Sequence, residues 1–591
     1  MKVKEGGTSP KELQLRKELY MPILKKKEPV KVKSSDTVIR ITNPNGKPKD
    51  VDGLVGDRQQ GYGWSMAERG DYIYIGTWFN TIGAVVTIIQ AGLKAKGLNL
   101  SQETIEAMMD TVSNNEIPHP TKGLGGQIYK MHKDKPGEFT KIFETDVSFR
   151  NVVLFGDDLY FTTYRGVNMN KVNHIYKVDL DDNVTSVYET TDGACSRANA
   201  ILDGKLYFAG ADSKFELDPG DEGRVKLAVL EKSNEDDTVW NYVADYHDFY
   251  EYSDDSAVKS PAGSPFWDMV AFKGSLYCTL PGHTGFIAYE GHPAKRGEKT
   301  KANKYGWVWT EIVGNNAVNY PGIQETPLGN MVDHGAGITS VVGAFGVFKD
   351  NLYCYNIDNT ISSEIMGISG MLSITQPDFK LSNFVGPVHD TLKHTQKMYK
   401  YNETTGRFDE CFGFTKLVEG SCVEYVWKSA VYNGEFYVGT MDSKVIYNYL
   451  TRLTNGSLLY MSLDDWKAQF GAIYRLIKSL ANKETLELVK TLKAAKENAP
   501  AVPKNSLKEK FDWEGIKMLA SVSNTVRKDP GGFHLIKTAD GEHWEHVTDC
   551  GFGDQFNYGC LRFAPTDHGL YMTTANPFYG TQLYLLKNNK A

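Results

Sequence analysis

One position that repeats along the chain collects side chains suited to ligand binding. Seven segments share an apolar run, a short turn containing Gly, Asp or Asn, and a second run that carries an apolar-Tyr pair. Aligning them on that pair places these residues at the start of the first run: Trp64, Arg150, Arg197, Trp267, Gly343, Trp427 and, approximately, Tyr558. Arginine binds carboxylate, phosphate or sulfate through its planar fork, and tryptophan offers a flat surface to sugars and cations. We therefore expect a site for an anionic or sugar-like small molecule. The alternative is that the tryptophans pack between repeats and the arginines pair with acids.

A second group of polar residues follows the second run of these segments. It contains Asn80, Tyr164, Arg165, Asp212, His283, Asn356, Asp358, Asp442 and Asn576, and Arg58 stands just before the first segment. Asp212, Asp442 and His283 can transfer protons if burial tunes their pKa values, although each also suits an ordinary polar loop. The predicted catalytic residues are Arg150, Arg197, Asp212 and His283. The predicted ligand-binding residues are Trp64, Trp267, Trp427, Tyr558, Arg58, Tyr164, Asn80 and Asn576.

The sequence predicts neither a metal site nor a cofactor site. His389 and His394 are close enough in sequence to approach one ion, but no third ligand is evident near them, and no Cys-x-x-Cys occurs. There is no GxSxG elbow, no P-loop and no GxGxxG coupled to a strand. We therefore expect no metal and no nucleotide or flavin cofactor.

The repeated segments are β-hairpin signals, such as WSMAERGDYIYIGT from Trp64 and WKSAVYNGEFYVGT from Trp427. After most of them come two more strand-like runs, and four strands per repeat are typical of a β-propeller blade. The last repeat has only three strands, and the run 36–43, DTVIRITN, can supply the fourth. The sequence therefore predicts an all-β, seven-bladed propeller closed by an N-terminal strand.

Three insertions interrupt the repeats at about 81–116, 361–394 and 443–529. The first and third contain apolar residues at helical spacing, and all three follow the second strand of a hairpin. In a propeller such loops emerge on one face, so we expect a mostly helical cap over one mouth of the central channel. The expected division is a flexible arm over 1–35 and a propeller over 36–591.

Composition restricts the partners and the location of the chain. A net charge of −7 gives no support for nucleic-acid binding, and the most apolar stretch, 82–91, is too short to span a bilayer. We expect a cytoplasmic protein if Met1 is the natural start, and an exported one if a leader was removed. Cys411 with Cys422, and Cys550 with Cys560, flank equivalent crossings between repeats. They suggest two local disulfides, with reduced thiols as the favoured alternative. The oligomeric state is left open.

The hairpins of the form apolar-Gly-x-Leu-Tyr resemble those of Kelch and Asp-box propellers, including sialidase-like ones. TADGEHWEHV, from Thr538 to Val547, resembles an Asp-box, and GFGDQFNYG with LYMTTANPFYGTQLY is similar to the closing blade of bacterial sialidase-like propellers. The resemblance implies the fold. Sialidases use an arginine triad with a Tyr/Glu pair and an Asp; of such a set, only Arg150 and Arg197 occur at suggestive repeat positions here. The expected function is an enzyme, a hydrolase, lyase or transferase, with a capped pocket. The alternative is a non-catalytic ligand-binding or protein-interaction propeller.

The repeat position generates a first testable prediction. Arg150→Ala and Arg197→Ala are each expected to abolish ligand binding or turnover while leaving folding nearly intact, because two guanidiniums side by side are stabilised by an anionic ligand. Melting temperature and ligand binding of both variants check this. Collapse of the fold in either variant, or unchanged binding in both, would make the arginines structural.

Overall fold

The structure is a computed structural model of the 591-residue chain. It describes residues 30–42, 57–81, 101, 103–104, 125–164, 172–190, 198–222, 225–249, 266–281, 286–313, 341–357, 382, 385–386, 389, 392, 396–405, 407–445 and 512–588.

Four separate four-stranded antiparallel sheets form the middle of the chain, and within each one the strands pair in sequence order. The first sheet contains β6 (Ser148–Phe155), β7 (Asp158–Tyr164), β8 (Asn173–Val178) and β9 (Val184–Thr190). The second contains β10 (Ala198–Leu202), β11 (Lys205–Ala211), β12 (Leu227–Lys232) and β13 (Trp240–Asp245). The third contains β14 (Asp268–Phe272), β15 (Ser275–Pro281), β16 (Phe286–Pro293) and β17 (Trp307–Val313). The fourth contains β18 (Val341–Phe348), β19 (Asn351–Ile357), β20 (Met398–Asn402) and β21 (Arg407–Glu410).

A 12-stranded sheet combines the two ends of the chain. Its early strands are β1 (Thr37–Arg40), β2 (Gln60–Arg69), β3 (Tyr72–Phe79), β4 (Gln127–His132) and β5 (Phe139–Glu144). Its late strands are β22 (Val423–Tyr432), β23 (Glu435–Asp442), β24 (Leu535–Thr538), β25 (Trp544–Thr548), β26 (Gly559–Thr566), β27 (Gly569–Ala575) and β28 (Leu583–Lys587). The expected N-terminal strand is β1, and it pairs antiparallel with β28. Single bridges, Met441 to Gly559 and Tyr62 to Ala575, join the successive four-strand groups of this sheet.

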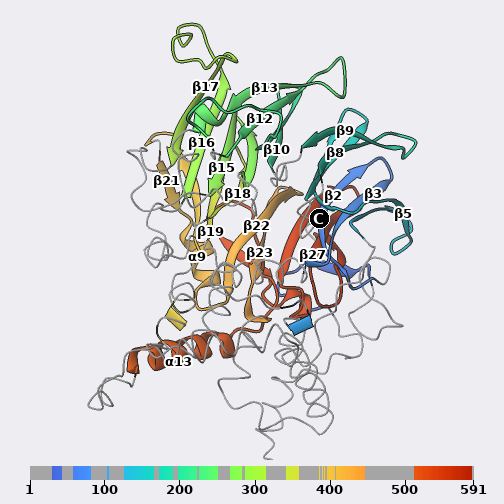
Figure 1. Ribbon diagram of the computed structural model, residues 1–591. Coiled ribbons are helices and arrows are strands. Elements are labelled where there is room, and N and C mark those ends of the chain that lie inside the picture. The colour runs from blue at the N-terminus through green and yellow to red at the C-terminus, as the bar shows by residue number, and fades with distance from the viewer. Residues whose placement is uncertain are drawn as a thin grey trace, which may run out of the picture.

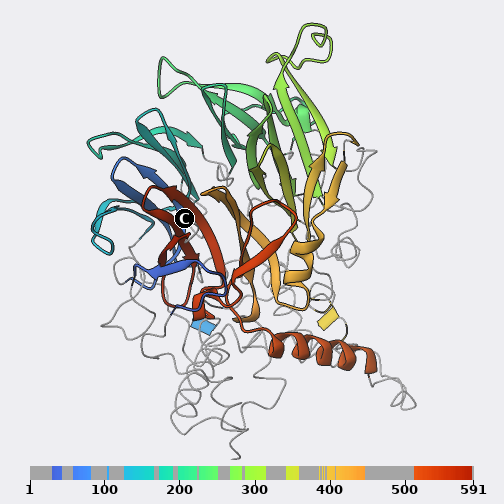
Figure 2. The same cartoon turned by 180° about the vertical axis from the view of Figure 1, so that it is seen from behind.

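The repeated sheets are the blades of a β-propeller. In Figures 1 and 2 they stand side by side in chain order, and the last, red strands lie against the first, blue ones. The first strands of successive sheets contact one another, as β2 does β6 and β18 does β22. The blades therefore present the starts of their first strands to one common region.

The apolar-Tyr pair explains why these segments form strands buried on both faces. The apolar member is Ile73, Leu159, Leu206, Leu276, Leu352, Phe436 or Leu570, and each is at most 1% exposed. The adjacent tyrosine points to the opposite side of the sheet, as strand geometry requires, and packs against the neighbouring blade. The tight turns also follow the sequence, since Asp203 and Gly204 both have positive φ, at 50° and 73°.

Helical residues gather at the end of the molecule that lies below β23 in Figure 1. Helix α13 (Trp513–Lys528), inside the insertion expected at 443–529, begins at Asp512, whose carboxylate accepts the Gly515 N–H. Val385 and Leu392, from the insertion expected at 361–394, pack with Val522 and Val526 on this helix. Segments of two insertions therefore meet at one end of the blades. Of the insertion at 81–116, only Thr81, Ser101, Glu103 and Thr104 belong to the described residues.

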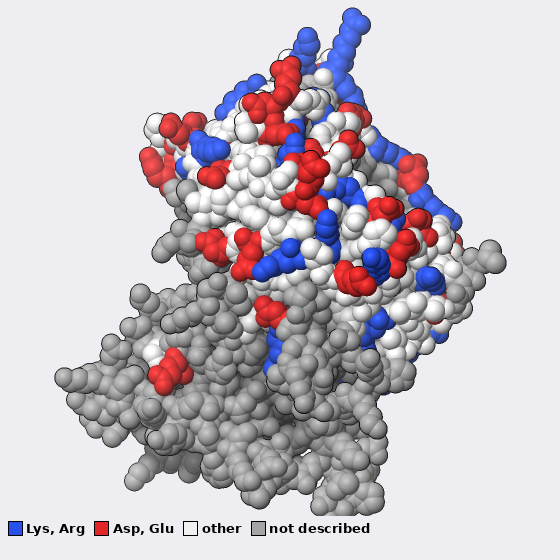
Figure 3. Space-filling view, turned by 90° about the vertical axis from the view of Figure 1, so that its right-hand side faces the viewer, with Lys and Arg blue, Asp and Glu red and all other residues white. Residues whose placement is uncertain are grey.

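Three short elements and the start of the described chain complete the fold. Helix α9 (Phe412–Val418) and the 3-10 turns η1 (Tyr246–Phe249) and η5 (Gly551–Gly553) connect strands. Residues 30–36 lie along the late strands, where the Lys33 N–H donates to the Val547 carbonyl at 2.8 Å. Within the described ranges no helix is long and apolar enough to cross a membrane. On the face shown in Figure 3, basic and acidic side chains are interspersed over the blades.

An ion-pair cluster joins the sheet β6–β9 to the sheet β10–β13. Asp237, between β12 and β13, accepts hydrogen bonds from Tyr160 Oη at 3.0 Å and Lys177 Nζ at 2.6 Å. Lys232 Nζ lies 2.7 Å from the same carboxylate. Burial alone would raise the pKa of Asp237, but hydrogen bonds from the two lysines and from Tyr160 outweigh it and lower the pKa to about 2.

The stability that the Asp237 ion pairs contribute between the two sheets is expected to depend on pH. Because the folded-state pKa of Asp237 lies below the unfolded-state value of about 3.9, its stabilisation is present above that pH and is lost as pH falls from about 4 towards 2. Asp237→Asn is expected to lower the free energy of unfolding at pH 6 by about 1–2 kcal/mol, after allowance for solvent screening. Urea denaturation at pH 6 and pH 3 measures this. The difference in free energy of unfolding between Asp237→Asn and wild type should be smaller at pH 3 than at pH 6. The control variant Asp181→Asn, in an exposed turn, should have the stability of wild type at both pH values. An equal difference at both pH values would contradict the linkage.

Candidate functional site

Aromatic side chains from several blades pack together where the first strands begin. This aromatic cluster consists of Tyr62, Trp64, Trp78, Tyr164, Trp267, Tyr425, Trp427 and Tyr558. Trp64 stacks on Trp78 with ring centroids 4.1 Å apart, and the other contacts are mostly edge to face. Five predicted ligand-binding residues, Trp64, Trp267, Trp427, Tyr558 and Tyr164, are therefore brought together in one place. Several blades position these rings: Tyr62 and Trp64 lie in β2, Trp78 in β3, Tyr164 in β7, and Tyr425 and Trp427 in β22, while Trp267 and Tyr558 directly precede β14 and β26.

The guanidinium of Arg150 lies on the aromatic cluster. Arg150 is buried in β6, and its guanidinium carbon lies 3.1 Å from the centroid of the Trp64 ring. The desolvated cation–π contact between Arg150 and Trp64 contributes about 2 kcal/mol. Arg150 and Trp64 are the residues of one repeat position in adjacent blades, and their side chains are in contact.

A second cation, Arg562 of β26, lies beside Arg150. Its Nε donates to the Trp64 carbonyl at 2.6 Å, and its Nη2 donates to the Arg150 carbonyl at 3.1 Å. Desolvation by burial lowers the pKa of Arg562 to about 10, with Asp268 opposing this shift and the charge of Arg150 adding to it. The Arg562 side chain thus connects β26 to β2 and β6, the first strands of three blades, and adds positive charge next to Trp64 of the aromatic cluster.

Asp268 and Lys428 form the other charged pair of this region. Lys428 Nζ of β22 pairs with one oxygen of the buried Asp268, and the other oxygen accepts the Phe345 N–H at 2.9 Å. This pair links β14, β18 and β22. Asp268 therefore pairs with Lys428 and also acts on the guanidinium of Arg562.

The ring of Trp427 is fixed by close contact with β26. A Cβ atom at Gly559 would lie 2.1 Å from Trp427 Cζ3, so only glycine leaves room for the indole there. Trp427 is buried, and in the described part of the chain its Nε1 has no hydrogen-bond partner. A buried donor without an acceptor costs about 1–3 kcal/mol. An acceptor atom of a ligand would remove that cost.

The other predicted ligand-binding residues hold loops beside the cluster. Arg58 donates through Nε to the Phe578 carbonyl at 2.8 Å and lies over the Tyr579 ring. Asn576 is buried, and its Oδ1 accepts the Tyr579 N–H at 2.9 Å. Asn80 ends β3 with a positive φ of 56°, and its N–H donates to the Gln59 carbonyl. In the structure Asn80 and Asn576 shape the backbone near the cluster.

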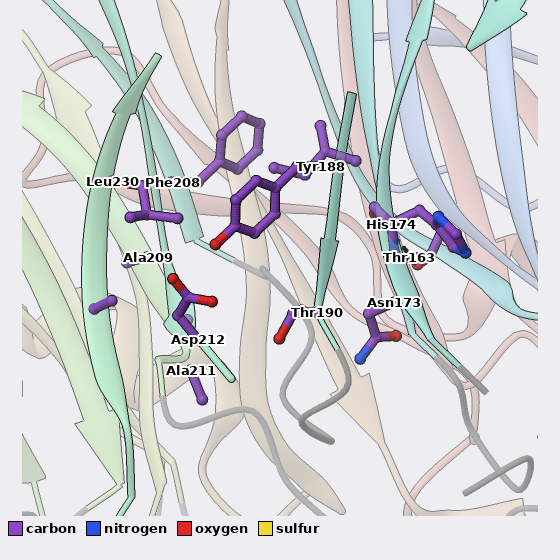
Figure 4. Close-up of a pocket in the computed structure, with 13 residues that line it drawn as sticks. Thr163, Asn173, His174, Tyr188, Thr190, Phe208, Ala209, Ala211, Asp212 and Leu230 are labelled. Atoms are coloured by element: carbon purple, nitrogen blue, oxygen red, sulfur yellow. Dashed lines mark hydrogen bonds between the residues drawn. The ribbon is translucent and has the colours of Figure 1, made fainter. Parts of the chain in front are cut away.

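Asp212 lies apart from the aromatic cluster, in a small cavity between the sheets β6–β9 and β10–β13. The cavity has a volume of about 30 Å³, and Thr163, His174, Tyr188, Phe208 and Leu230 are among its lining residues. Asp212 accepts hydrogen bonds from Tyr242 Oη and from the Lys214 N–H, and Figure 4 shows the Tyr188 hydroxyl facing its carboxylate. The pKa of Tyr188 is raised, first by burial and then by Asp212. A space this small suits water, since ligand pockets usually exceed about 300 Å³.

Several predicted residues cannot be placed at this site. Arg197 and His283 lie outside the described residues, as do Arg165, Asp358 and His394. Asp442 is described, and it lies at the end of β23 in a separate buried group with Asp529 and His534.

Sequence reasoning missed Arg562, Asp268 and Lys428. A signal for all three was present, because Asp268, Lys428 and Arg562 each stand nine residues before the tyrosine of their apolar-Tyr pair, so opposite charges occupy one repeat position in different blades. Alignment of the last hairpin on Tyr558 concealed this position for Arg562. The suggested disulfides are absent from the described residues, where Cys411, Cys422, Cys550 and Cys560 are free thiols.

Comparison with known proteins yields only distant structural similarity. No protein-family model and no curated protein matches the sequence. Among solved structures, a nidogen/laminin complex matches with a TM-score of 0.25 and 13% identity, covering 50% of this chain and 76% of that chain. A structure from an analysis of two prolyl endopeptidases matches with a TM-score of 0.29 and 8% identity, covering 66% of this chain and 40% of that chain. Acylaminoacyl peptidase from Pyrococcus horikoshii matches with a TM-score of 0.29 and 10% identity, covering 65% of this chain and 44% of that chain. At these scores the matches carry no conclusion about function.

Arg562 is expected to be required for stability. Arg562→Ala removes a buried cation and leaves the carbonyls of Trp64 and Arg150 without this donor, so we expect the free energy of unfolding to fall by about 3 kcal/mol. Guanidinium denaturation measures the change. Arg296→Ala, which removes an exposed arginine from the turn after β16, should change it by less than about 0.5 kcal/mol. Equal stability of Arg562→Ala and wild type would contradict the structural role.

Proposed function

We propose that the chain is a closed seven-bladed propeller that binds an anionic small molecule with a flat or sugar-like part at the mouth of its central channel. The four separate sheets and three groups of the large sheet, β2–β5, β22–β25 and β26–β28 with β1, make up the seven blades of this proposal. Contacts between first strands support the ring, running from β2 through β6, β10, β14, β18 and β22 to β26, and from β26 back to β2. The antiparallel pairing of β1 with β28 supports closure by the N-terminal strand.

Turn geometry supports assignment to the Asp-box type. Asp540, in the turn between β24 and β25, accepts the N–H groups of Glu542 and His543 at 2.8 and 2.7 Å. Its other oxygen bonds to the His543 ring at 2.6 Å. Asp540 thus closes the turn between β24 and β25 within TADGEHWEHV, the segment that resembles an Asp-box.

The observation that carries the ligand proposal is the placement of Arg150 on Trp64, with Arg562 beside it. Arg150 and Arg562 bring two like charges together where burial limits screening by water, so a bound anion offsets their repulsion. The indole N–H of Trp427 supplies a neutral donor on the same cluster. Planar aromatic faces bind the apolar face of a sugar ring or another flat group, and the cations bind the carboxylate, sulfate or phosphate. Helix α13 and the residues packed on it support a cap at this end. Conversion of the ligand by a hydrolase, lyase or transferase stays a prediction from the sequence.

Calorimetric titration with sulfate, inorganic phosphate, glucuronate and neutral glucose tests the proposal. At constant ionic strength we expect glucuronate and at least one inorganic anion to bind, and glucose to bind more weakly than glucuronate. Arg150→Gln and Trp427→Phe should each weaken glucuronate binding about tenfold, or about 1.4 kcal/mol, because one removes the cation and the other only the N–H. Arg40→Gln serves as the control. Binding of none of the three anions, or equal binding by all variants, would contradict the proposal.

A further inference from the structure

A second group of reactive side chains lies where α13 returns to the blades. Asp442 ends β23, Asp529 follows the last residue of α13, and His534 precedes β24. All three are buried, and one ligand atom from each lies within 4.8 Å of the other two. The sequence placed only Asp442 among reactive residues and predicted no metal site.

Two atoms of this group face each other without a hydrogen-bond partner. Asp442 Oδ2 and His534 Nε2 are 4.0 Å apart, and their side chains are 0% and 4% exposed. Neither atom has a hydrogen-bond partner in the described ranges. Two ligands at about 2.0–2.2 Å from one metal ion can be at most about 4.2 Å apart, so an ion fits between these atoms.

The remaining atoms of the same side chains are held by other groups. His534 Nδ1 and His546 Nε2 are 3.1 Å apart, which fixes the imidazole plane. The Asp529 oxygens accept the N–H groups of Cys422 and Gly531, both at 2.6 Å. Carboxylate oxygens keep further lone pairs when they accept such bonds, and outer partners of this kind orient metal ligands.

The charges also favour a cation at this place. Asp442 and Asp529 bring two carboxylates together in a buried space. Lys444 lies at this cluster, with its Nζ donating to the Asp529 main-chain carbonyl and its N–H donating to Asp442 Oδ1. A divalent ion between the ligand atoms supplies two positive charges that match the two carboxylates.

We propose that Asp442, Asp529 and His534 bind one divalent first-row transition-metal ion, such as Zn²⁺ or Mn²⁺. One imidazole with two carboxylates is a ligand set that these ions accept. The bound ion joins the C-terminal end of α13 to β23 and β24. The site is adjacent to the aromatic cluster, because the Asp442 N–H donates to the Tyr558 carbonyl at 2.7 Å. This proposal does not depend on the anion proposal.

A surface group of the same composition provides an internal control. Asp218, Asp221 and His247 also bring ligand atoms together, but this group is partly exposed. Both His247 nitrogens already face carboxylates, at 2.8 Å from Asp245 and 3.2 Å from Asp218. The Asp221 carboxylate accepts the Tyr246 hydroxyl at 2.7 Å. Its atoms are satisfied within the protein, so we assign no ion to it.

The test measures metal content in the purified full-length protein. The protein is treated with EDTA, reloaded separately with ZnCl₂ and MnCl₂, freed of excess ion and analysed by mass spectrometry of the elements. We expect about one ion per chain with at least one of the two metals in wild type and in His247→Gln, and at least a tenfold loss of retained ion in Asp442→Asn and in His534→Gln. X-ray absorption of the loaded wild type should show nitrogen and oxygen ligands with imidazole scattering, which keeps the test valid if a variant fails to fold.

The contrary results are equally specific. A wild-type protein that retains neither metal would overturn the proposal and favour a proton shared between Asp442 and Asp529. Retention unchanged in folded Asp442→Asn and His534→Gln would also overturn it. Loss confined to His247→Gln would move the ion to the surface group.

Discussion

A desolvated guanidinium holds the first strands of three blades together. Arg562 donates to the main-chain carbonyls of Trp64 and Arg150, so β26 is fixed against β2 and β6, strands that lie about 500 and 400 residues away in the chain. Strand pairing links the same ends through the bridge between Tyr62 and Ala575. The aromatic cluster depends on this alignment, because most of its rings come from these blades and from β22, and Trp267 directly precedes β14. The guanidiniums of Arg150 and Arg562 and the packed aromatic rings thus lie together at these strands.

Buried and partly buried cations define the chemistry of this region. Burying several cations costs free energy unless each has hydrogen-bond acceptors or a counter-ion. Arg562 has two carbonyls and Lys428 has Asp268, while Arg150 lies on the indole of Trp64. The anion that we propose would bind beside Arg150, next to Arg562 and the aromatic rings.

The sequence predicted the strands well because a local signal defines them. The apolar-Tyr pair and the tight turn specify a hairpin within about fourteen residues, and the repeat position then brought Trp64, Trp267, Trp427 and Tyr558 together. Long-range pairs were not predictable in this way. Lys428 and Asp268 are 160 residues apart, and only the ring of blades makes them neighbours. Asp442 and Asp529 are separated by a whole insertion, so no spacing rule connects them. The roles of Asn576 and Asp212 were not predictable for a different reason. A polar side chain at a strand end can bond to main-chain N–H groups of the following loop as readily as it can bind a ligand.

The most direct test of the central claim is the position of an anion in a crystal soaked with selenate. Anomalous scattering from selenium locates the anion independently of any assumed ligand. The account predicts a peak at the aromatic cluster, with selenate oxygens within about 3.5 Å of the Arg150 guanidinium or Trp427 Nε1. Selenate bound only to surface lysines, with the cluster closed around an unoccupied Arg150, would contradict it.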